Sequence, residues 1–319
     1  MGEFDLIERF FKRPAFRADV GIGDDCAVWS PRSGHQLAFS ADMLVEGRHF
    51  LPTVNPRHLG HKSLAVNLSD LAACGATPQA FLLSLSLPRA DEAWLDGFSQ
   101  GLFQLSELHG CELIGGDTTQ GPLNIAITIM GDTPHGQSIL RSGAKAGDDL
   151  YVSGHLGDAC LALEAFRGKV SLPQAVFDSA RLRMECPTPR VALGQALRGI
   201  ANAMADISDG LLGDLGHILK ASQVGAEIDV SAVTPLMLTE TLWSCPHDLA
   251  LDCVLSGGDD YELVFCASPF ACAQVQHAAN YSGTPVTRIG RITDSQRLVL
   301  LGFDGLPMTK SFHSFDHFS

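Results

Sequence analysis

Residues 56–88, PRHLGHKSLAVNLSDLAACGATPQAFLLSLSLP, contain the clearest secondary-structure pattern in the chain. Three leucines spaced four and three residues apart form one helical stripe: Leu64, Leu68 and Leu71. Because Gly75 stands where helices commonly end, the stripe predicts a helix over 56–75. A strand is predicted over 81–87, up to the next proline. Asp70 and the glycine interrupt the apolar run, so the stretch is not a membrane span.

The rest of the first half is predicted to be short strands and one further helix. The strands are expected at 36–44, 111–114 and 123–130, with a strand-like CAVW at 26–29. The segment GGDTTQGP at 115–122 is predicted to be the turn between two of them. Asp91 is expected to cap a helix over 91–109. This half therefore predicts a sheet with helices packed on it.

The second half alternates strand and helix. Strands are predicted at 150–153 and 261–266, and helices at 158–166 and 209–220. The small polar segment RSGAKAGD begins at Arg141, and 319 residues fit two domains better than one. We therefore predict an α/β fold of two layered domains, 1–138 and 139–319.

Charge and cysteine usage exclude several classes of protein. The net charge is −14, which disfavours binding to nucleic acid or to an anionic membrane surface. A phosphate substrate would need positive charge from elsewhere. Residues 1–11 lack the basic and apolar regions of a signal peptide, so a cytoplasmic location is expected. The nine cysteines are scattered singly, which predicts reduced, mostly buried thiols.

Aspartates recur where predicted elements end, beside glycine or serine. They are Asp24, Asp25, Asp42, Asp117, Asp206 and Asp209. Any one of them alone is ordinarily a solvated turn or N-cap residue. Several carboxylates without basic neighbours in sequence indicate a site for a hard cation such as Mg²⁺, which binds oxygen ligands and substrate phosphates. Such a cation would also supply the missing positive charge.

Asp70 allows two interpretations. It is the only charged residue between Lys62 and Arg89, inside a predicted helix of small and apolar groups. It lies either on a solvent-exposed face with Ser63 and Asn67, or in a cleft as a metal ligand. The spacing alone does not decide between them.

Other phosphate and metal motifs have little or no support. The chain contains no GxxxxGK[ST] loop and no GxSxG elbow. GHLG at 154–157 lacks the full GxGxxG spacing and is interpreted as a helix-entry turn. The histidine pairs His58/His61 and His313/His317 have no third ligand in motif spacing, which disfavours zinc.

Eight segments together resemble the thiamine-monophosphate kinase family. They follow the family order and span nearly the whole chain: GIGDDCAV (21–28), FSADMLVEGRHF (39–50), NLSDLAACGA (67–76), IGGDTTQGPL (114–123), RSGAKAGDDLYVSG (141–154), DISDGLLGDLGHI (206–218), SGGDDYEL (256–263) and FDHF (315–318). The combination of the NLSDLAA, GGDT and DxSDG motifs favours this family over its relatives, aminoimidazole ribonucleotide synthetase, selenophosphate synthetase and the hydrogenase-maturation dehydratase.

The resemblance implies an enzyme that transfers the γ-phosphate of ATP directly to thiamine monophosphate. The products would be thiamine diphosphate and ADP, in the last step of thiamine diphosphate biosynthesis. It also implies several Mg²⁺ ions and a homodimer. The N-terminal domain would build a barrel-like sheet across the dimer interface, beside a C-terminal α/β domain.

The resemblance assigns site residues motif by motif. The metal ligands would be Asp25, Ser40, Ala41, Asp42, Asp70, Asp117, Asp206 and Asp209. The ATP contacts would be Gly116, Asp117, Arg141 and Ser208, and the substrate contacts His49, Asp259 and Phe315. Of these residues, Asp70, Asp117 and Asp209 are expected to be catalytic.

Three positions depart from the family pattern. Ala41 stands where the family usually has Thr, so a metal contact is kept only if it uses the backbone carbonyl. Asp259 replaces a common Glu, and Phe315 replaces a more usual Tyr or Trp. The last two changes concern substrate fit rather than phosphoryl transfer.

Two other functions are weighed against the kinase. One is a superfamily relative that uses ATP to activate another acceptor, such as selenide. Selenophosphate synthetases typically need a reactive Cys in a glycine-rich loop, and here only Cys26 lies near one, at the start of a predicted strand. The other is a nucleotide-binding regulator without catalysis, which the retained oxygen ligands disfavour.

Overall fold

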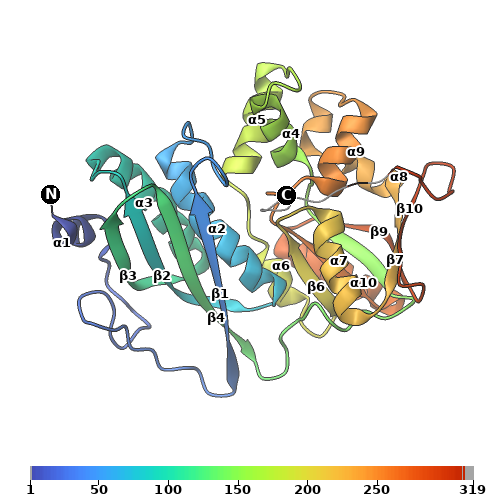
Figure 1. The fold of residues 1–319 in the computed structure, drawn as a ribbon. Coiled ribbons are helices and arrows are strands. Elements are labelled where there is room, and N and C mark those ends of the chain that lie inside the picture. Colours follow the sequence, from blue (N-terminus) through green and yellow to red (C-terminus); the bar gives the residue numbers. More distant parts are fainter. Residues whose placement is uncertain (1, 311, 313–319) are drawn as a thin grey trace. The chain divides into compact units, whose positions relative to one another are not determined.

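The computed structural model describes residues 2–310 and 312. Contacts between residues divide the chain into two units (Figure 1). Unit 1 comprises Met1–Leu71 and Ala76–Gly136, and unit 2 comprises Ala72–Gly75 and Gln137–Ser319. Each unit has its own sheet. The coarse prediction of a two-part α/β chain is therefore confirmed.

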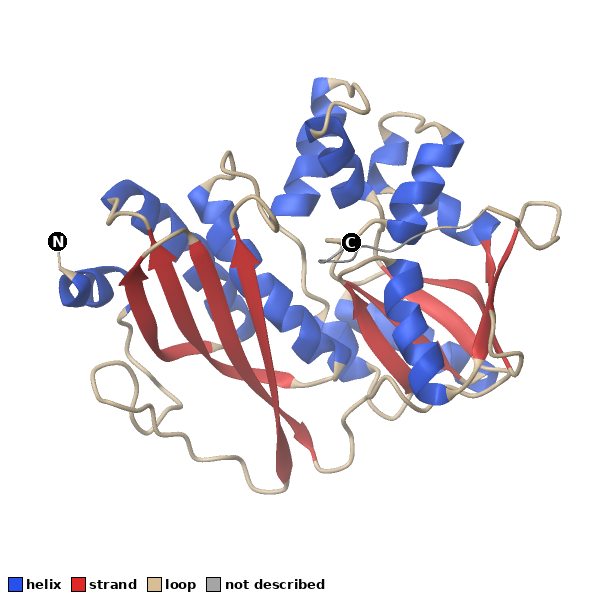
Figure 2. Cartoon of the chain, in the orientation of Figure 1, coloured by secondary structure: helices blue, strands red, loops and turns tan. Residues whose placement is uncertain are grey.

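Unit 1 is a four-stranded sheet with helices on one face (Figures 1 and 2). Its strand order is β1-β4-β2-β3, in which β2 and β3 are parallel and the other pairs antiparallel. The elements are α1 (Glu3–Leu6), η1 (Ile7–Phe11), β1 (His35–Val45), α2 (Pro56–Ala73), β2 (Thr77–Leu87), α3 (Glu92–His109), β3 (Glu112–Gln120) and β4 (Asn124–Pro134). Asp91 caps α3 as predicted, accepting hydrogen bonds from the backbone N–H groups of Ala93 and Trp94.

Helix α2 is buried on more faces than its leucine stripe predicts. The stripe is buried as expected: Leu64, Leu68 and Leu71. Ser63 and Asn67 are also buried, so the interpretation of a solvent-exposed face was wrong. Ser63 Oγ donates to the Leu59 carbonyl at 2.7 Å, and Asn67 Nδ2 donates to the Ser63 carbonyl at 3.0 Å. These bonds back to the helix satisfy polar groups that would otherwise be costly to bury.

The predicted turn at 115–122 was wrong for most of its length. Residues 115–120 belong to β3 and pair in parallel with β2. Gly116 has φ 145°, and a Cβ added there would lie 1.9 Å from the Leu83 carbonyl oxygen. Only glycine permits this close approach of the two strands. The glycine pair thus serves strand packing rather than a turn.

The predicted strand-like segment at 26–29 was also wrong. It contains a single bridge, between Val28 and Val20, within a loop. Asp24 and Asp25 are exposed in that loop, and Asp24 Oδ1 accepts a hydrogen bond from the Asp25 N–H at 2.8 Å. These carboxylates are therefore carried by irregular backbone.

Unit 2 is a six-stranded mixed sheet with order β10-β7-β9-β5-β8-β6. Its elements are β5 (Asp149–Ser153), α4 (Asp158–Phe166), α5 (Gln174–Glu185), α6 (Val191–Ala196), β6 (Ala201–Ile207), α7 (Leu211–Ser222), β7 (Gly225–Asp229), α8 (Val230–Val233), η2 (Thr234–Leu236), η3 (Leu238–Thr241), α9 (His247–Ser256), β8 (Glu262–Ala267), η4 (Pro269–Ala271), α10 (Cys272–Ser282), β9 (Val286–Thr293) and β10 (Leu298–Leu301). Helix α7 begins two residues later than predicted.

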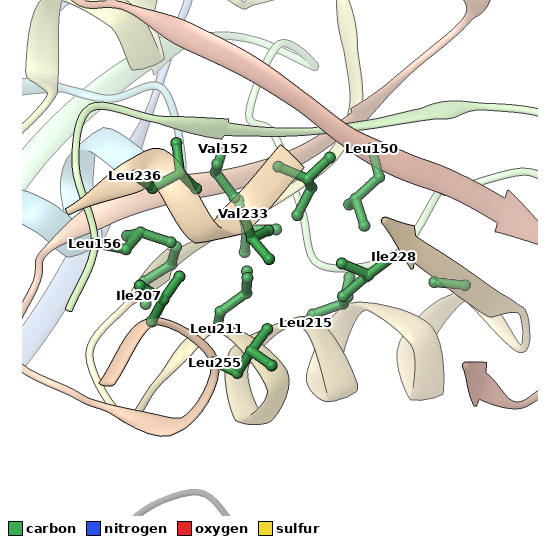
Figure 3. Packing of buried hydrophobic residues seen from close by; sticks show 14 of the residues in the cluster. Leu150, Val152, Leu156, Ile207, Leu211, Leu215, Ile228, Val233, Leu236 and Leu255 are labelled. Atoms are coloured by element: carbon green, nitrogen blue, oxygen red, sulfur yellow. The ribbon is translucent and has the colours of Figure 1, made fainter. Parts of the chain in front are cut away.

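The core of unit 2 forms between the sheet and its helices. Figure 3 shows Leu150 and Val152 of β5 packing with Leu211 and Leu215 of α7. All four side chains are fully buried. Removing this apolar surface from water is the main stabilising contribution to the unit. The end of β6 and the start of β8 are thereby fixed. Strand β6 leads into one loop that carries predicted site residues, and β8 follows another.

The nine cysteines are free, as predicted, but only Cys111, Cys253 and Cys266 are buried. The prediction that most thiols are buried was therefore wrong. In the described part of the chain, no helix combines the length and the apolar character that crossing a membrane requires.

Candidate active site

Strand β1 and helix α2 bring Ser40 and Asp70 together in unit 1. Ser40 Oγ donates a hydrogen bond to Asp70 Oδ2. Asp42 lies two residues further along β1, on the same face as Ser40, and Leu44 on that face is buried. One hydroxyl and two carboxylates therefore lie on the helix-covered side of the sheet. They are oxygen donors of the kind that Mg²⁺ prefers.

Ala41 lies on the opposite face of β1. Its neighbours on that face, Phe39 and Met43, are exposed, as Ala41 is. In the register of the sheet it shares a row with Thr128 and Leu82, which are exposed too. The side chain at position 41 therefore points away from Ser40 and Asp42.

Within this chain Asp117 lies far from Ser40 and Asp70. It lies on β3 opposite Ser84, and its row continues through Ala126 to Met43 on β1. Three strand spacings separate β3 from β1, which is about 14 Å. Asp117 is exposed there, directly after Gly116.

His49 is held in the turn that follows β1. The Val45 N–H donates to His49 Nδ1 at 2.9 Å, and Lys62 Nζ donates to the His49 carbonyl at 3.2 Å. Lys62 is 2% exposed, which is unusual for a lysine. Sequence reasoning did not single it out. Its only signal was a basic residue directly before the mainly apolar second part of the helix.

In unit 2, Asp214 holds the loop that carries Ser208 and Asp209. Its Oδ2 atom accepts hydrogen bonds from both of their backbone N–H groups, at 3.0 Å each. Burial raises the pKa of Asp214 to about 6, against the lowering effect of these bonds. Asp206 is buried at the end of β6 just before this loop. Sequence reasoning missed Asp214, whose signal is an acid in the first helical turn after Gly210.

Loop 257–261 is bound directly to the same segment. The Asp259 N–H donates to the Ser208 carbonyl at 2.9 Å, and the Tyr261 N–H donates to the Ile207 carbonyl at 2.8 Å. The Tyr261 hydroxyl donates to Asp259 Oδ1 at 3.2 Å. Unit 2 thus brings together four predicted site residues: Asp206, Ser208, Asp209 and Asp259.

Arg141 is exposed near this segment. Its positive charge lowers the pKa of Asp214, as the smallest of the several effects on that group. Its carbonyl accepts a hydrogen bond from Ser222 Oγ at 3.2 Å. The predicted substrate contact Phe315, like His313 and His317, falls outside the described residues.

Across residues 2–310 and 312, no three His, Cys, Asp or Glu side chains are grouped so that they could hold a metal ion. Mg²⁺ is often bound by only one or two carboxylates together with substrate phosphates. The hydroxyl and carboxylate donors near Asp70 fit that mode of binding by their chemistry.

Comparison with known families defines the class of protein. AIR synthase related protein, N-terminal domain, matches residues 23–133, and AIR synthase related protein, C-terminal domain, matches residues 145–302. Together these matches cover well over half of the chain. The fold with its two glycine- and aspartate-rich loops is thus that of an AIR synthase related protein.

Individual proteins that are similar to this chain over nearly its whole length define its family within this class. Thiamine-monophosphate kinase of Escherichia coli K12 is 44% identical over 322 residues, covering 100% of this chain and 98% of that protein. The crystal structure of thiamine-monophosphate kinase from Stenotrophomonas maltophilia K279a matches with a TM-score of 0.85 and 43% identity over 96% of each chain. AaThiL complexed with AMPPCP and TMP matches with a TM-score of 0.74 and 28% identity, over 90% of this chain and 89% of that one.

The chain belongs to the thiamine-monophosphate kinase family. The predicted enzyme class, an ATP-dependent phosphotransferase acting on thiamine monophosphate, is confirmed by this membership. The two alternatives, a relative with another acceptor and a regulator without catalysis, lose their support.

Proposed function

We propose that this enzyme transfers the γ-phosphate of ATP directly and in line to the phosphate of thiamine monophosphate. The observation that best supports this proposal is the pair of backbone hydrogen bonds between loop 257–261 and residues 207–208. Through them Asp259, which we assign to the substrate, adjoins Ser208, which we assign to ATP. Adjoining contacts for two phosphate-bearing molecules suit transfer without a covalent enzyme intermediate.

The reaction needs positioning more than acid–base chemistry. The acceptor is already an ionised phosphate, so no strong general base is required. The difficulty is bringing two polyanions together. Arg141 is assigned to the phosphates of ATP, where its exposed guanidinium can stabilise negative charge. His49, held by Lys62, is assigned to thiamine monophosphate together with Asp259 and Phe315.

We assign Mg²⁺ binding to oxygen donors in both units. They are Asp25, Ser40, Ala41, Asp42, Asp70 and Asp117 in unit 1, and Asp206 and Asp209 in unit 2. The donor chemistry supports this assignment, because the set contains only carboxylate, hydroxyl and carbonyl oxygens. Bound Mg²⁺ would screen the repulsion between donor and acceptor phosphates. Asp70, Asp117 and Asp209 are the proposed catalytic members.

The alanine at position 41 is compatible with a metal contact through the backbone. Its side chain lies on the face opposite Ser40 and Asp42, so a hydroxyl at this position would point away from them. We therefore propose that position 41 offers its carbonyl oxygen. The replacement of the family's usual Thr by Ala41 then removes no metal ligand.

We further propose a homodimer formed through the face of the unit 1 sheet that carries no helices, where two sheets would build the barrel. This face carries four exposed apolar side chains: Leu37, Phe39, Met43 and Leu82. An apolar sheet face of this kind commonly marks an interface. Asp117 shares a row with Met43, so it would lie close to such an interface.

The dimer is tested by sedimentation of Phe39→Glu. A charge at this 65%-exposed position should convert a dimer into a monomer. Phe270→Glu is the control, since Phe270 is 98% exposed in unit 2 and should leave the mass unchanged. A wild-type protein that sediments as a monomer at working concentration would overturn the proposal.

Two further assignments complete the proposal. The domains are taken as 1–138 and 139–319, close to the boundary between the two units at residues 136 and 137, and the enzyme is taken as cytoplasmic.

The function is tested by ADP release with a panel of acceptors, each with and without Mg²⁺. Thiamine monophosphate, thiamine and a nucleoside monophosphate form the panel. We expect release only with thiamine monophosphate and metal together. Nucleotide binding without acceptor-stimulated release would overturn the proposed reaction.

A further inference from the structure

Loop 257–261 has an unfavourable backbone conformation. Asp259 and Tyr261 have φ angles of 71° and 51°, a region that residues other than glycine rarely occupy. Such residues keep this conformation only where their surroundings enforce it. The contacts on both sides of the loop must therefore hold it in place.

One side of the loop is held by the backbone of residues 207–208, as described above. The other side is held by two buried carboxylates. Both oxygens of Asp260 accept from the Gly157 N–H at the start of α4, at 3.0 and 2.9 Å. Glu262, the first residue of β8, is fully buried directly after the loop.

Four groups surround the Glu262 carboxylate. Oε2 accepts from Ser153 Oγ and from Arg190 Nε, both at 2.6 Å. Oε1 accepts from a second Arg190 nitrogen and from Arg183 Nη2 at 3.2 Å, and weakly from the His155 N–H. The Ser153 hydroxyl in turn accepts from the Leu263 N–H at 2.8 Å. The end of β5, helix α5 and the start of α6 thus converge on one carboxylate.

Arg190 is the dominant partner of this carboxylate. It binds Glu262 in two-pronged fashion, the geometry in which arginine recognises a carboxylate most strongly. Arg183 uses a single nitrogen, and its Nε is buried without a hydrogen bond among the described residues. Breaking a buried pair by removing one partner leaves an uncompensated charge, which the structure relieves by moving.

We propose that Arg190 and Glu262 are positioning residues for the substrate. Together they clamp the start of β8, and this clamp keeps Asp259 and Tyr261 in their left-handed conformation. Neither residue touches the substrate itself. This inference rests on the proposed assignment of Asp259 to thiamine monophosphate. Loss of the clamp lets the loop relax, so binding of that substrate weakens.

The test compares Arg190→Gln with Arg181→Gln. Arg181 is a matched control in the same unit, because its Nε also binds a buried glutamate, Glu185, at 2.7 Å, but within helix α5. We expect Arg190→Gln to raise KM for thiamine monophosphate about tenfold or more, as losing a charged hydrogen bond would. KM for ATP should change little, since Asp214 holds the Ser208 loop separately.

Hydrogen exchange gives a second measurement that does not depend on activity. The peptide covering 257–263 should exchange faster in Arg190→Gln than in Arg181→Gln. If Arg190→Gln and Arg181→Gln both melt at lower temperature but have the same KM for thiamine monophosphate and the same exchange of this peptide, the Arg190–Glu262 pair is only structural. That result overturns the proposal. Should Arg190→Gln fail to fold, Arg190→Lys decides: it keeps the charge but loses the two-pronged contact, and an unchanged KM overturns the proposal.

Asp259→Ala separates this inference from the function on which it rests. A raised KM for thiamine monophosphate in Asp259→Ala, with no change in Arg190→Gln, refutes the clamp alone. An unchanged KM in Asp259→Ala refutes the assignment of Asp259 to the substrate.

Discussion

Replacing Asp214 with alanine should impair ATP use far more than it impairs folding. The Asp214 carboxylate accepts both N–H bonds that orient Ser208 and Asp209. Bonds to a charged acceptor are each worth about 1.5–3 kcal/mol. Water can replace part of this, because Ser208 and Asp209 are only half-buried. Removing a buried carboxylate also relieves the cost of burying it.

Loss of the loop's hydrogen bonds and relief of the buried charge partly cancel in stability, so we expect a small effect on stability and a large one on activity. We expect Asp214→Ala to lower the free energy of unfolding by about 1–3 kcal/mol and Tm by no more than about 10 °C. Displacement of the loop by about 1 Å should lower kcat/KM for ATP about 100-fold. The assay is steady-state ADP release at saturating thiamine monophosphate, at a pH above the pKa of about 6, where Asp214 is ionised.

Asp158 supplies a matched control. It is a fully buried acid in the first turn of α4, and its carboxylate accepts from the backbone N–H groups of Leu238 and Thr239. Asp158→Ala should therefore cost similar stability without the selective loss of ATP use. If kcat/KM for ATP in Asp214→Ala stays within about threefold of wild type, the reasoning is refuted.

Two other outcomes follow from the same geometry. Asp70→Asn and Asp209→Asn should each lower kcat more than about 100-fold with little change in Tm, because an amide binds Mg²⁺ poorly. In Asp70→Asn the amide oxygen can still accept the hydrogen bond from Ser40. A loss of kcat accompanied by a large fall in Tm would make these residues structural. Asp260→Asn tests the pH dependence of stability. Burial raises the pKa of Asp260 well above 3.8, so the folded protein favours the protonated carboxyl. The contribution of this group to stability is therefore full below pH 3.8 and is lost as pH rises. Melting curves from pH 5 to 8.5 without metal should show wild type losing Tm relative to Asp260→Asn as pH rises, and a constant difference would contradict this.

Local sequence patterns were sufficient to predict some of the regular elements, whereas others in unit 2, such as α5, β6 and α10, were not predicted. The leucine stripe of α2, the Asp91 cap of α3 and the alternation in β4 each reflect forces local to one segment. The segment around Gly116 was mispredicted, because its glycines serve an approach between two strands that pair far apart in sequence. Local rules cannot detect such a contact.

The site was predictable only to the extent that motifs carry it. Asp206 and Asp209 were singled out by their position beside a predicted helix start, and Asp259 by the family resemblance; the hydrogen bonds between their loops agree with that grouping. Asp214, Glu262 and Arg190 were missed, since each acts by holding backbone or another side chain in place. A charge that becomes buried through tertiary packing looks in sequence like any surface charge. Asp70 was ambiguous for the same reason, until the burial of Ser63 and Asn67 removed the solvent-exposed interpretation.

The most direct test of the central claim, phosphoryl transfer from ATP to thiamine monophosphate, uses ATP carrying labelled γ-phosphate. The reaction contains thiamine monophosphate and Mg²⁺, and the products are separated. We expect the label in the terminal phosphate of thiamine diphosphate, in amounts equal to the ADP formed, and none without metal. Label found only in inorganic phosphate, or ADP formed without thiamine diphosphate, would contradict transfer between the two bound substrates.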